Sequence, residues 1–248
     1  MQLLVSVANA TEARHAVEGG ADLIDAKDPS AGALGAVSLD TLREIGDVVS
    51  GRRVVSAALG DAAEEEGIER ASSDYGRMGI GFVKVGFADI TDLSRVERLL
   101  ASAVRGVRPS GLQQCGVVAV AYADTGGTTS VEPTALVDIA ARTGAIGILL
   151  DTAQKDGPGL LNLLSPTALE RWVAMAHRAG LTVALAGKLT AEDLPIISET
   201  GADIVGVRGA ACEGVRSSRV TEVKVRRLTE SLQRLGTPRG ALGAPLGS

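Results

Sequence analysis

The sequence predicts a single closed (β/α)₈ barrel, in which eight parallel strands alternate with helices. Short apolar, β-branched runs alternate with longer amphipathic stretches along the chain, which is the pattern of repeated strand–helix units. The chain has 248 residues, close to the ~250 of one such barrel. Eight candidate strands can be placed, the number that one barrel needs. A doubly wound open sheet is the alternative, but no glycine-rich dinucleotide fingerprint follows the first strand, which runs into Asn9-Ala10-Thr11-Glu12.

The expected strands are short and rich in apolar residues. We place them at Leu3–Ala8, Leu23–Lys27, Val54–Leu59, Phe82–Gly86, Val117–Tyr122, Ile146–Asp151, Val183–Ala186 and Ile204–Val207.

Helices are expected between these strands. Thr11–Glu18 has Thr11 as a candidate cap and Gly19-Gly20 as a stop, and Pro133–Arg142 is closed by Gly144. Gly20-Ala21-Asp22 recurs as Gly201-Ala202-Asp203, each before a strand, which suggests equivalent helix–strand junctions. We therefore assign residues 1–235 to the barrel and expect the Gly- and Pro-rich tail 236–248 to be disordered.

Composition excludes several classes of function. A net charge of -5 and an aromatic content of 2% provide neither the basic surface nor the stacking residues of a nucleic-acid-binding protein. The N-terminus has no basic region ahead of an apolar one, and no apolar run is long enough to span a membrane. Cys115 and Cys212 are too few for a disulfide framework. We expect a cytoplasmic protein without a nucleic-acid or membrane partner, and its oligomeric state stays open.

Lysine is rare and unevenly placed. The chain has five lysines against 20 arginines, yet four of the five lie at or just after the carboxyl ends of expected strands two, four, six and seven. These are Lys27, Lys84, Lys155 and Lys188. Barrel enzymes keep their chemistry at that end. A lysine amine can lose its proton and attack a carbonyl, which arginine cannot do, and neighbouring ammonium groups favour that loss. A role in phosphate binding or ion pairing alone is the alternative for any one of them.

Two aspartates accompany the lysines. Asp25 and Lys27 are two residues apart on one strand, so both must face the barrel interior. Asp151 ends strand six and Lys155 follows four residues later, which repeats the pairing across the barrel mouth. The pocket would then be positively charged overall and suited to phosphate esters.

Glycine-rich segments provide candidate phosphate sites. Gly187 and Lys188 follow strand seven, and Arg208, Gly209 and Ala210 follow strand eight, where barrels commonly bind phosphate through backbone N–H groups. Small-residue turns are the alternative. Residues 30–35 could form a second phosphate site or a mobile loop, and residues 156–159 have the composition of a lid hinge.

Metal and histidine chemistry are not expected. His15 and His177 fall within expected helices, away from the strand ends. No group of His, Cys and carboxylates has the spacing of metal ligands. A mechanism based on lysine, without a metal or organic cofactor, is the prediction.

The same residues carry a family resemblance. The segments DLIDAKDPSAGALGA, FVKVGF, LLDTAQKDG, ALAGKL and DIVGVRGAAC resemble those of the (5-formylfuran-3-yl)methyl phosphate synthase family of methanofuran biosynthesis, in order over about residues 1–235. The resemblance implies a (β/α)₈ lyase that condenses two molecules of glyceraldehyde 3-phosphate into 4-(hydroxymethyl)-2-furancarboxaldehyde phosphate, with loss of phosphate and water.

The resemblance also implies roles for individual residues. Lys27 matches the Schiff-base lysine, Lys84 the proton-transfer residue, and Asp25, Asp151 and Lys155 further active-site positions. Two other functions stay open: another Schiff-base sugar-phosphate aldolase, and a barrel that binds phosphate esters without turnover.

Overall fold

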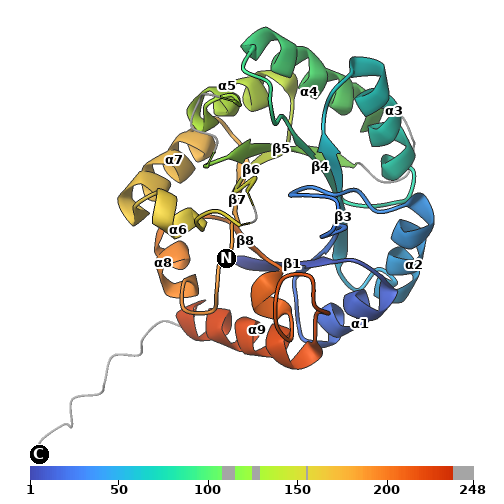
Figure 1. The fold of residues 1–248 in the computed structure, drawn as a ribbon, viewed down its shortest axis with the longest axis vertical. Helices are drawn as coiled ribbons and strands as arrows, with labels where there is room; N and C mark the ends of the chain where they lie inside the picture. The colour runs from blue at the N-terminus through green and yellow to red at the C-terminus, as the bar shows by residue number, and fades with distance from the viewer. Residues whose placement is uncertain (108–114, 125–128, 155, 237–248) are drawn as a thin grey trace, which may run out of the picture.

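A computed structural model describes residues 1–107, 115–124, 129–154 and 156–236. Eight parallel strands form a closed barrel in which each strand pairs with the next in sequence and β8 pairs with β1 (Figure 1). The strands are β1 (Gln2–Val7), β2 (Leu23–Ala26), β3 (Val54–Asp61), β4 (Phe82–Gly86), β5 (Gly116–Tyr122), β6 (Gly147–Asp151), β7 (Thr182–Leu185) and β8 (Ile204–Val207). The predicted barrel is confirmed, and each of these strands overlaps the range expected for it.

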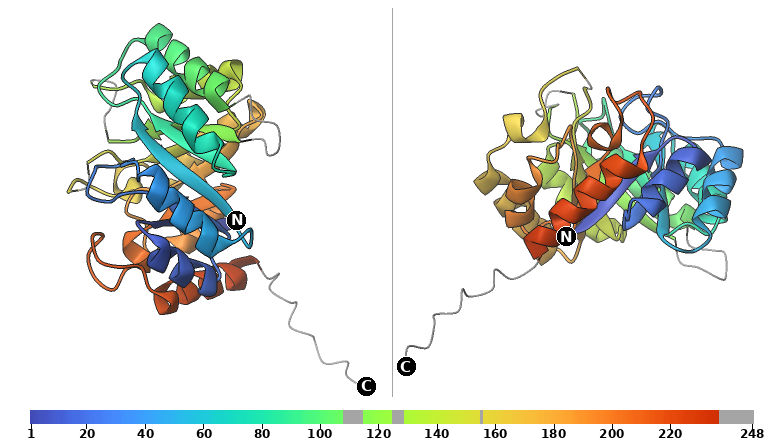
Figure 2. Two further views of the ribbon diagram at one scale, coloured as in Figure 1. Left: turned by 90° about the vertical axis from the view of Figure 1, so that its right-hand side faces the viewer. Right: turned by 90° about the horizontal axis from the view of Figure 1, so that it is seen from below.

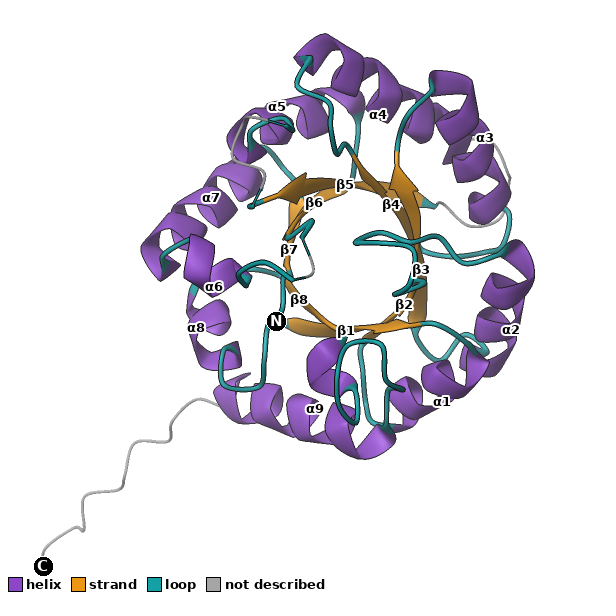
Figure 3. Cartoon of the chain, in the orientation of Figure 1, coloured by secondary structure: helices purple, strands orange, loops and turns teal. Residues whose placement is uncertain are grey.

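Helices surround the barrel in the described part of the chain (Figure 3). They are α1 (Ala10–Glu18), α2 (Leu39–Val49), α3 (Glu65–Gly76), α4 (Leu93–Val107), α5 (Pro133–Thr143), α6 (Leu160–Leu163), α7 (Pro166–Arg178), α8 (Leu194–Glu199) and α9 (Glu222–Gly236), with a 3₁₀ turn η1 (Gly209–Ala211). Helix α9 packs against α1 and α8 and so completes the ring (Figure 2). In this part of the chain, no helix is both long and apolar enough to cross a membrane.

Local signals set the helix ends. The cap of α1 is Asn9, whose side chain accepts a hydrogen bond from the Glu12 amide at 3.0 Å, so the prediction of Thr11 as the cap was wrong. Both residues are good caps, and the chain leaves β1 early enough for Asn9 to take the position. Helix α5 does end at Gly144, which adopts φ 85 as a left-handed C-cap should.

The repeated Gly-Ala-Asp sequences are equivalent junctions, as predicted. Gly20 and Gly201 both have positive φ, at 91° and 79°. Asp22 accepts a hydrogen bond from the Leu3 amide, and Asp203 accepts one from the Val183 amide, each at 2.8 Å. Each aspartate therefore ties the start of its own strand to the strand before it.

The apolar residues form two layers. The larger cluster lies between the strands and the helices, and the smaller one fills the barrel interior with side chains such as Leu4, Phe82, Val118, Leu149 and Ile204. Because strand residues alternate between these layers, the polar residues on inward positions must lie inside the barrel. The division at residue 235 stays a prediction, and residues 237–248 lie outside the described part.

Candidate active site

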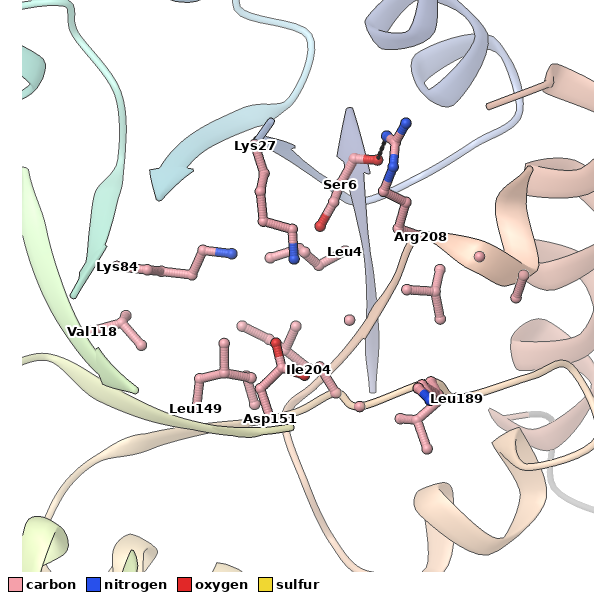
Figure 4. Close-up of a pocket in the computed structure, with 18 of the residues that line it drawn as sticks. Leu4, Ser6, Lys27, Lys84, Val118, Leu149, Asp151, Leu189, Ile204 and Arg208 are labelled. Atoms are coloured by element: carbon pink, nitrogen blue, oxygen red, sulfur yellow. Dashed lines mark hydrogen bonds between the residues drawn. The ribbon is translucent and has the colours of Figure 1, made fainter. Parts of the chain in front are cut away.

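The main candidate site is a cavity of about 300 Å³ in the barrel, open at the carboxyl ends of the strands. Its lining includes most of the predicted site residues: Lys27, Lys84, Asp151, Gly187, Lys188, Arg208, Gly209 and Ala210. Apolar residues such as Leu4, Val118, Leu149 and Ile204 line the same cavity (Figure 4). Residues predicted from several different strand ends are thus brought into one cavity.

Asp25 forms the centre of a buried polar cluster under this cavity. Its side chain is fully buried, and its carboxylate accepts hydrogen bonds from Ser6 at 2.8 Å and Ser56 at 2.9 Å. Lys84, which is 3% exposed, places its Nζ 2.6 Å from Oδ2 of Asp25. A buried carboxylate is stable only when its charge and hydrogen bonds are satisfied, and these three donors do so. From their spacing on one strand, we expected Asp25 to pair with Lys27. In the structure, Asp25 forms an ion pair with Lys84.

Lys27 extends strand β2 by one step and points into the cavity. Its backbone N–H donates to Val7 at 2.9 Å, which continues the pairing of β1 with β2. The residue is 7% exposed. Figure 4 shows the amines of Lys27 and Lys84 directed toward the same space. The strand alternation that places Asp25 and Lys27 inside the barrel is therefore correct.

Asp151 faces the lysines from the other side of the cavity (Figure 4). It ends β6, is 3% exposed, and its Oδ1 accepts a hydrogen bond from the Thr152 amide at 2.7 Å. Asp124 fixes the next turn, because its carboxylate oxygens accept from the Ala153 and Gln154 amides at 2.8 and 2.7 Å. Lys155, the next predicted site residue, lies outside the described residues.

The loop after β7 has an unusual backbone. Gly187 has φ 107 and Lys188 has φ 56, a conformation that a side chain disfavours. Because of this φ, a side chain at position 187 would be strained, and its Cβ would also lie only 3.0 Å from Cγ2 of Thr152, so glycine is favoured here. The Lys188 amine donates to the carbonyl of Gly157, and the Leu160 amide donates to the carbonyl of Gly187 at 2.9 Å. The predicted lid segment, residues 156–159, is therefore held beside Lys188.

Arg208 is held by the protein itself. Its guanidinium makes an ion pair with Glu12, with N···O distances of 2.8 and 3.2 Å. It also donates to the carbonyls of Ser6, Arg216 and Ser218. These bonds use all five of its N–H groups. In this arrangement the Arg208 side chain supports the loop after β8, and the loop itself, at Gly209 and Ala210, faces the cavity.

A second polar cluster lies beside the first, at the ends of β3 and β5. The Tyr122 hydroxyl donates to Asp61 at 2.8 Å, and Asp61 also accepts from the Ala88 amide. Burial first, and then the nearby Asp61 carboxylate, raises the pKa of Tyr122 far above its usual range. A Cβ on Gly86 would lie 2.2 Å from Asp61, so glycine is required there.

Besides Glu12, the partner of Arg208, sequence reasoning missed Ser6, Ser56 and Arg216 in this region. Ser6 and Ser56 are paired in register with Asp25 on its two neighbouring strands, and a hydroxyl within each apolar strand was the available signal. Arg216 also lines the cavity, from the loop between η1 and α9, and nothing in its local sequence indicated this.

The two histidines lie away from the cavity, as predicted. His15 on α1 bonds to the Val220 carbonyl at 2.9 Å, and His177 on α7 lies 2.8 Å from Asp203. Within the described ranges, no three His, Cys, Asp or Glu residues are arranged to hold a metal ion.

Solved structures with related folds share the barrel. A 3-hexulose-6-phosphate synthase is 18% identical, with a TM-score of 0.62 over 93% of this chain and 99% of its own. KGPDC from Streptococcus mutans is 12% identical, with a TM-score of 0.65 over 95% of this chain and 99% of its own. At these identities the likeness establishes the fold alone.

Sequence relatives establish the family. The family model described as 4-HFC-P synthase matches residues 3–229. The (5-formylfuran-3-yl)methyl phosphate synthase of Methanopyrus kandleri is 41% identical over 84% of this chain and 87% of its own. The synthase of the same name from Methanocaldococcus jannaschii is 38% identical over 84% of this chain and 88% of its own. This chain, a barrel with lysines at its strand ends, therefore belongs to the (5-formylfuran-3-yl)methyl phosphate synthase family of enzymes.

Proposed function

We propose that this enzyme condenses two molecules of glyceraldehyde 3-phosphate through a Schiff base on Lys27. The product is 4-(hydroxymethyl)-2-furancarboxaldehyde phosphate, and phosphate and water are lost, so the reaction class is a carbon–oxygen lyase. The observation that carries the proposal is that the Lys27 amine shares one cavity with the Lys84–Asp25 ion pair and Asp151.

Lys27 is the proposed nucleophile. Its amine would attack the substrate carbonyl and lose water to form an iminium ion, which is an electron sink that acidifies the adjacent carbon. The low exposure of the side chain supports this role, because a largely water-excluded cavity protects the iminium from hydrolysis.

Lys84 is the proposed proton carrier. The Asp25 carboxylate, held by Ser6 and Ser56, fixes the Lys84 amine at 2.6 Å. A fixed amine beside the iminium can give and take the proton of the adjacent carbon. Asp25 is thus a positioning residue, because its carboxylate acts through Lys84.

Asp151 and Lys155 are proposed to serve the dehydration and phosphate-loss steps. Asp151 faces the two amines across the cavity, so it can exchange protons with an intermediate bound between them (Figure 4). Lys155 follows the turn that Asp124 fixes, and its role rests on the family resemblance.

Phosphate is proposed to bind at the loops after β7 and β8. Lys188 supplies an ammonium group, and Gly187, Gly209 and Ala210 supply backbone at the cavity wall. The first N–H groups of the η1 turn have no partner within that turn, so they can donate to an anion. Arg208 would act indirectly, by fixing the loop that carries Gly209.

Borohydride trapping tests the mechanism. Reduction during reaction with glyceraldehyde 3-phosphate should leave a stable adduct on the Lys27 peptide. Lys27→Arg should abolish both the adduct and turnover, because guanidinium cannot form an imine. Lys224→Arg, on the exposed face of α9, is the matched control and should retain both. An active Lys27→Arg enzyme would exclude this nucleophile.

Product analysis tests the reaction. The wild-type enzyme and glyceraldehyde 3-phosphate should release inorganic phosphate and form an ultraviolet-absorbing furan, which mass spectrometry identifies. A simple aldol product without phosphate release would instead support another Schiff-base aldolase, and an absence of turnover would support a binding protein.

A further inference from the structure

Arg216 differs from the other arginines in the described part of the chain. Eight of those arginines lie within ion-pair distance of a carboxylate. Of the remaining described arginines, only Arg216 is partly buried, and the others are exposed. A partly buried cation without a carboxylate partner loses hydration without recovering it from an ion pair. Such a group at a cavity wall is suited to bind an anion.

The contacts of Arg216 leave part of its guanidinium available. It donates to the carbonyls of Pro29 at 2.9 Å and Gly32 at 3.2 Å. These two bonds fix the plane of the group and use two of its five N–H groups, and no described acceptor takes the other three. Arg216 also lines the cavity. The guanidinium is therefore both held in position and able to donate further hydrogen bonds.

The neighbouring charges do not cancel this cation. Arg208 is already neutralised by Glu12 at 2.8 Å. Asp151 interacts with Arg216 only over a longer distance, beyond an ion pair. Burial lowers the pKa of Arg216, and an anion beside it would oppose that effect. The local field at this part of the wall consequently favours a negative ligand.

Arg216 and Lys188 belong to different sides of the cavity. Arg216 contacts the loop after β2 through Pro29 and Gly32, next to Lys27 in sequence. Lys188 instead contacts the loop after β6 through Gly157. We propose that Arg216 forms a second anion site and binds the phosphate of one of the two triose phosphates, while Lys188 binds the other. This inference rests on the proposed condensation, which requires room for two phosphorylated molecules.

Separate assays of trapping and condensation test the assignment. Arg216→Gln removes the charge but keeps a donor for the loop carbonyls. If Arg216 holds the second substrate, the variant and the wild type should need nearly the same concentration of triose phosphate for borohydride trapping on Lys27. Its KM for furan formation should rise by about 10- to 100-fold, the effect of one or two charge-assisted hydrogen bonds. Arg216→Lys should restore part of that loss.

A neighbouring arginine provides the control. Arg219 lies in the same loop, forms an exposed ion pair with Glu213, and does not line the cavity. Arg219→Gln should match the wild type in both assays. If Arg216→Gln weakens trapping and condensation equally, Arg216 acts on the first substrate or on the loop, and its assignment to the second substrate is wrong. Unchanged KM for condensation would also overturn it.

Titration with inorganic phosphate separates this proposal from the proposed reaction. Calorimetry should find two phosphate ions per wild-type chain, one in Arg216→Gln and one in Lys188→Ala. If the wild type makes no furan but these stoichiometries hold, the proposed reaction fails and the second anion site stands. Equal phosphate binding by the wild type and Arg216→Gln would refute the site, whatever the reaction.

Discussion

The floor and the rim of the cavity are built from different parts of the chain. On the floor, the Asp25 carboxylate is held by Ser6, Ser56 and Lys84, which project from three other strands. On the rim, Lys188 bonds to a loop carbonyl, and Arg208 supports its loop through an ion pair with α1. Strand register therefore fixes the floor, whereas contacts between loops fix the rim. We expect floor substitutions to affect stability and chemistry together, and rim substitutions to affect substrate binding first.

Asp25→Asn should have the largest effect. It leaves the Lys84 ammonium buried without its carboxylate, which typically costs about 3–5 kcal/mol of unfolding free energy. Loss of a positioned proton carrier should also lower kcat by about 10²- to 10⁴-fold. Urea unfolding and steady-state kinetics measure the two effects.

An exposed ion pair is the control for this prediction. Glu65 pairs with Arg98 at the surface, where both side chains are about half exposed. Glu65→Gln should cost less than about 1 kcal/mol and leave kcat unchanged. If Asp25→Asn were as mild as Glu65→Gln, the expectation that floor substitutions affect stability and chemistry together would be wrong.

Arg208→Gln should have the next largest effect. It breaks the buried pair with Glu12, which is 5% exposed. Breaking a buried ion pair typically costs about 3–5 kcal/mol of unfolding free energy. Glu12 keeps two backbone donors, the amides of Ala8 at 2.7 Å and Val220 at 3.3 Å. We therefore expect this substitution to cost about 3 kcal/mol of unfolding free energy. Because Arg208 supports the loop with Gly209, KM should rise more than kcat falls. A large fall in kcat with KM unchanged would place Arg208 with the floor instead.

The same comparison explains which features the sequence could predict. The positions of Asp25, Lys27, Lys84 and Asp151 follow from strand alternation, because a residue two steps along a strand returns to the same face. The partner of Asp25 did not follow, since spacing along one strand says nothing about which neighbouring strand supplies the donor. Arg216 and Glu12 were missed for a related reason: their contacts join segments that only the closed barrel brings together.

Lys188→Ala should act mainly on binding. Removal of an ammonium group that contacts phosphate in both ground and transition states should raise KM about 10-fold with little change in kcat. Steady-state kinetics with glyceraldehyde 3-phosphate measure this, and an unchanged KM would remove Lys188 from the phosphate site.

Lys188→Gly sharpens this test. Residue 188 has φ 56, which glycine adopts without strain and alanine does not. The Lys188→Gly variant should therefore be about 1 kcal/mol more stable to unfolding than Lys188→Ala while showing the same KM. A difference in KM between the two variants would mean that backbone strain at this position, and not the amine alone, shapes the phosphate site.

The smallest expected effect concerns the predicted lid at residues 156–159. Lys188 and Asn162 bond to this segment, at the Gly157 carbonyl and the Gly159 amide, so it is partly held before substrate binds. If it closes over a phosphate ligand, its amides should exchange hydrogen more slowly with ligand than without. Mass spectrometry of the peptide across residues 156–159 measures this, and the capped start of α7 at residues 165–168 is the internal control. Because Lys188 would link the ligand to the segment, Lys188→Ala should abolish the slowing. Equal or faster exchange with ligand in the wild type would show that the segment is a fixed part of the rim, and the rim would then bind phosphate without closing.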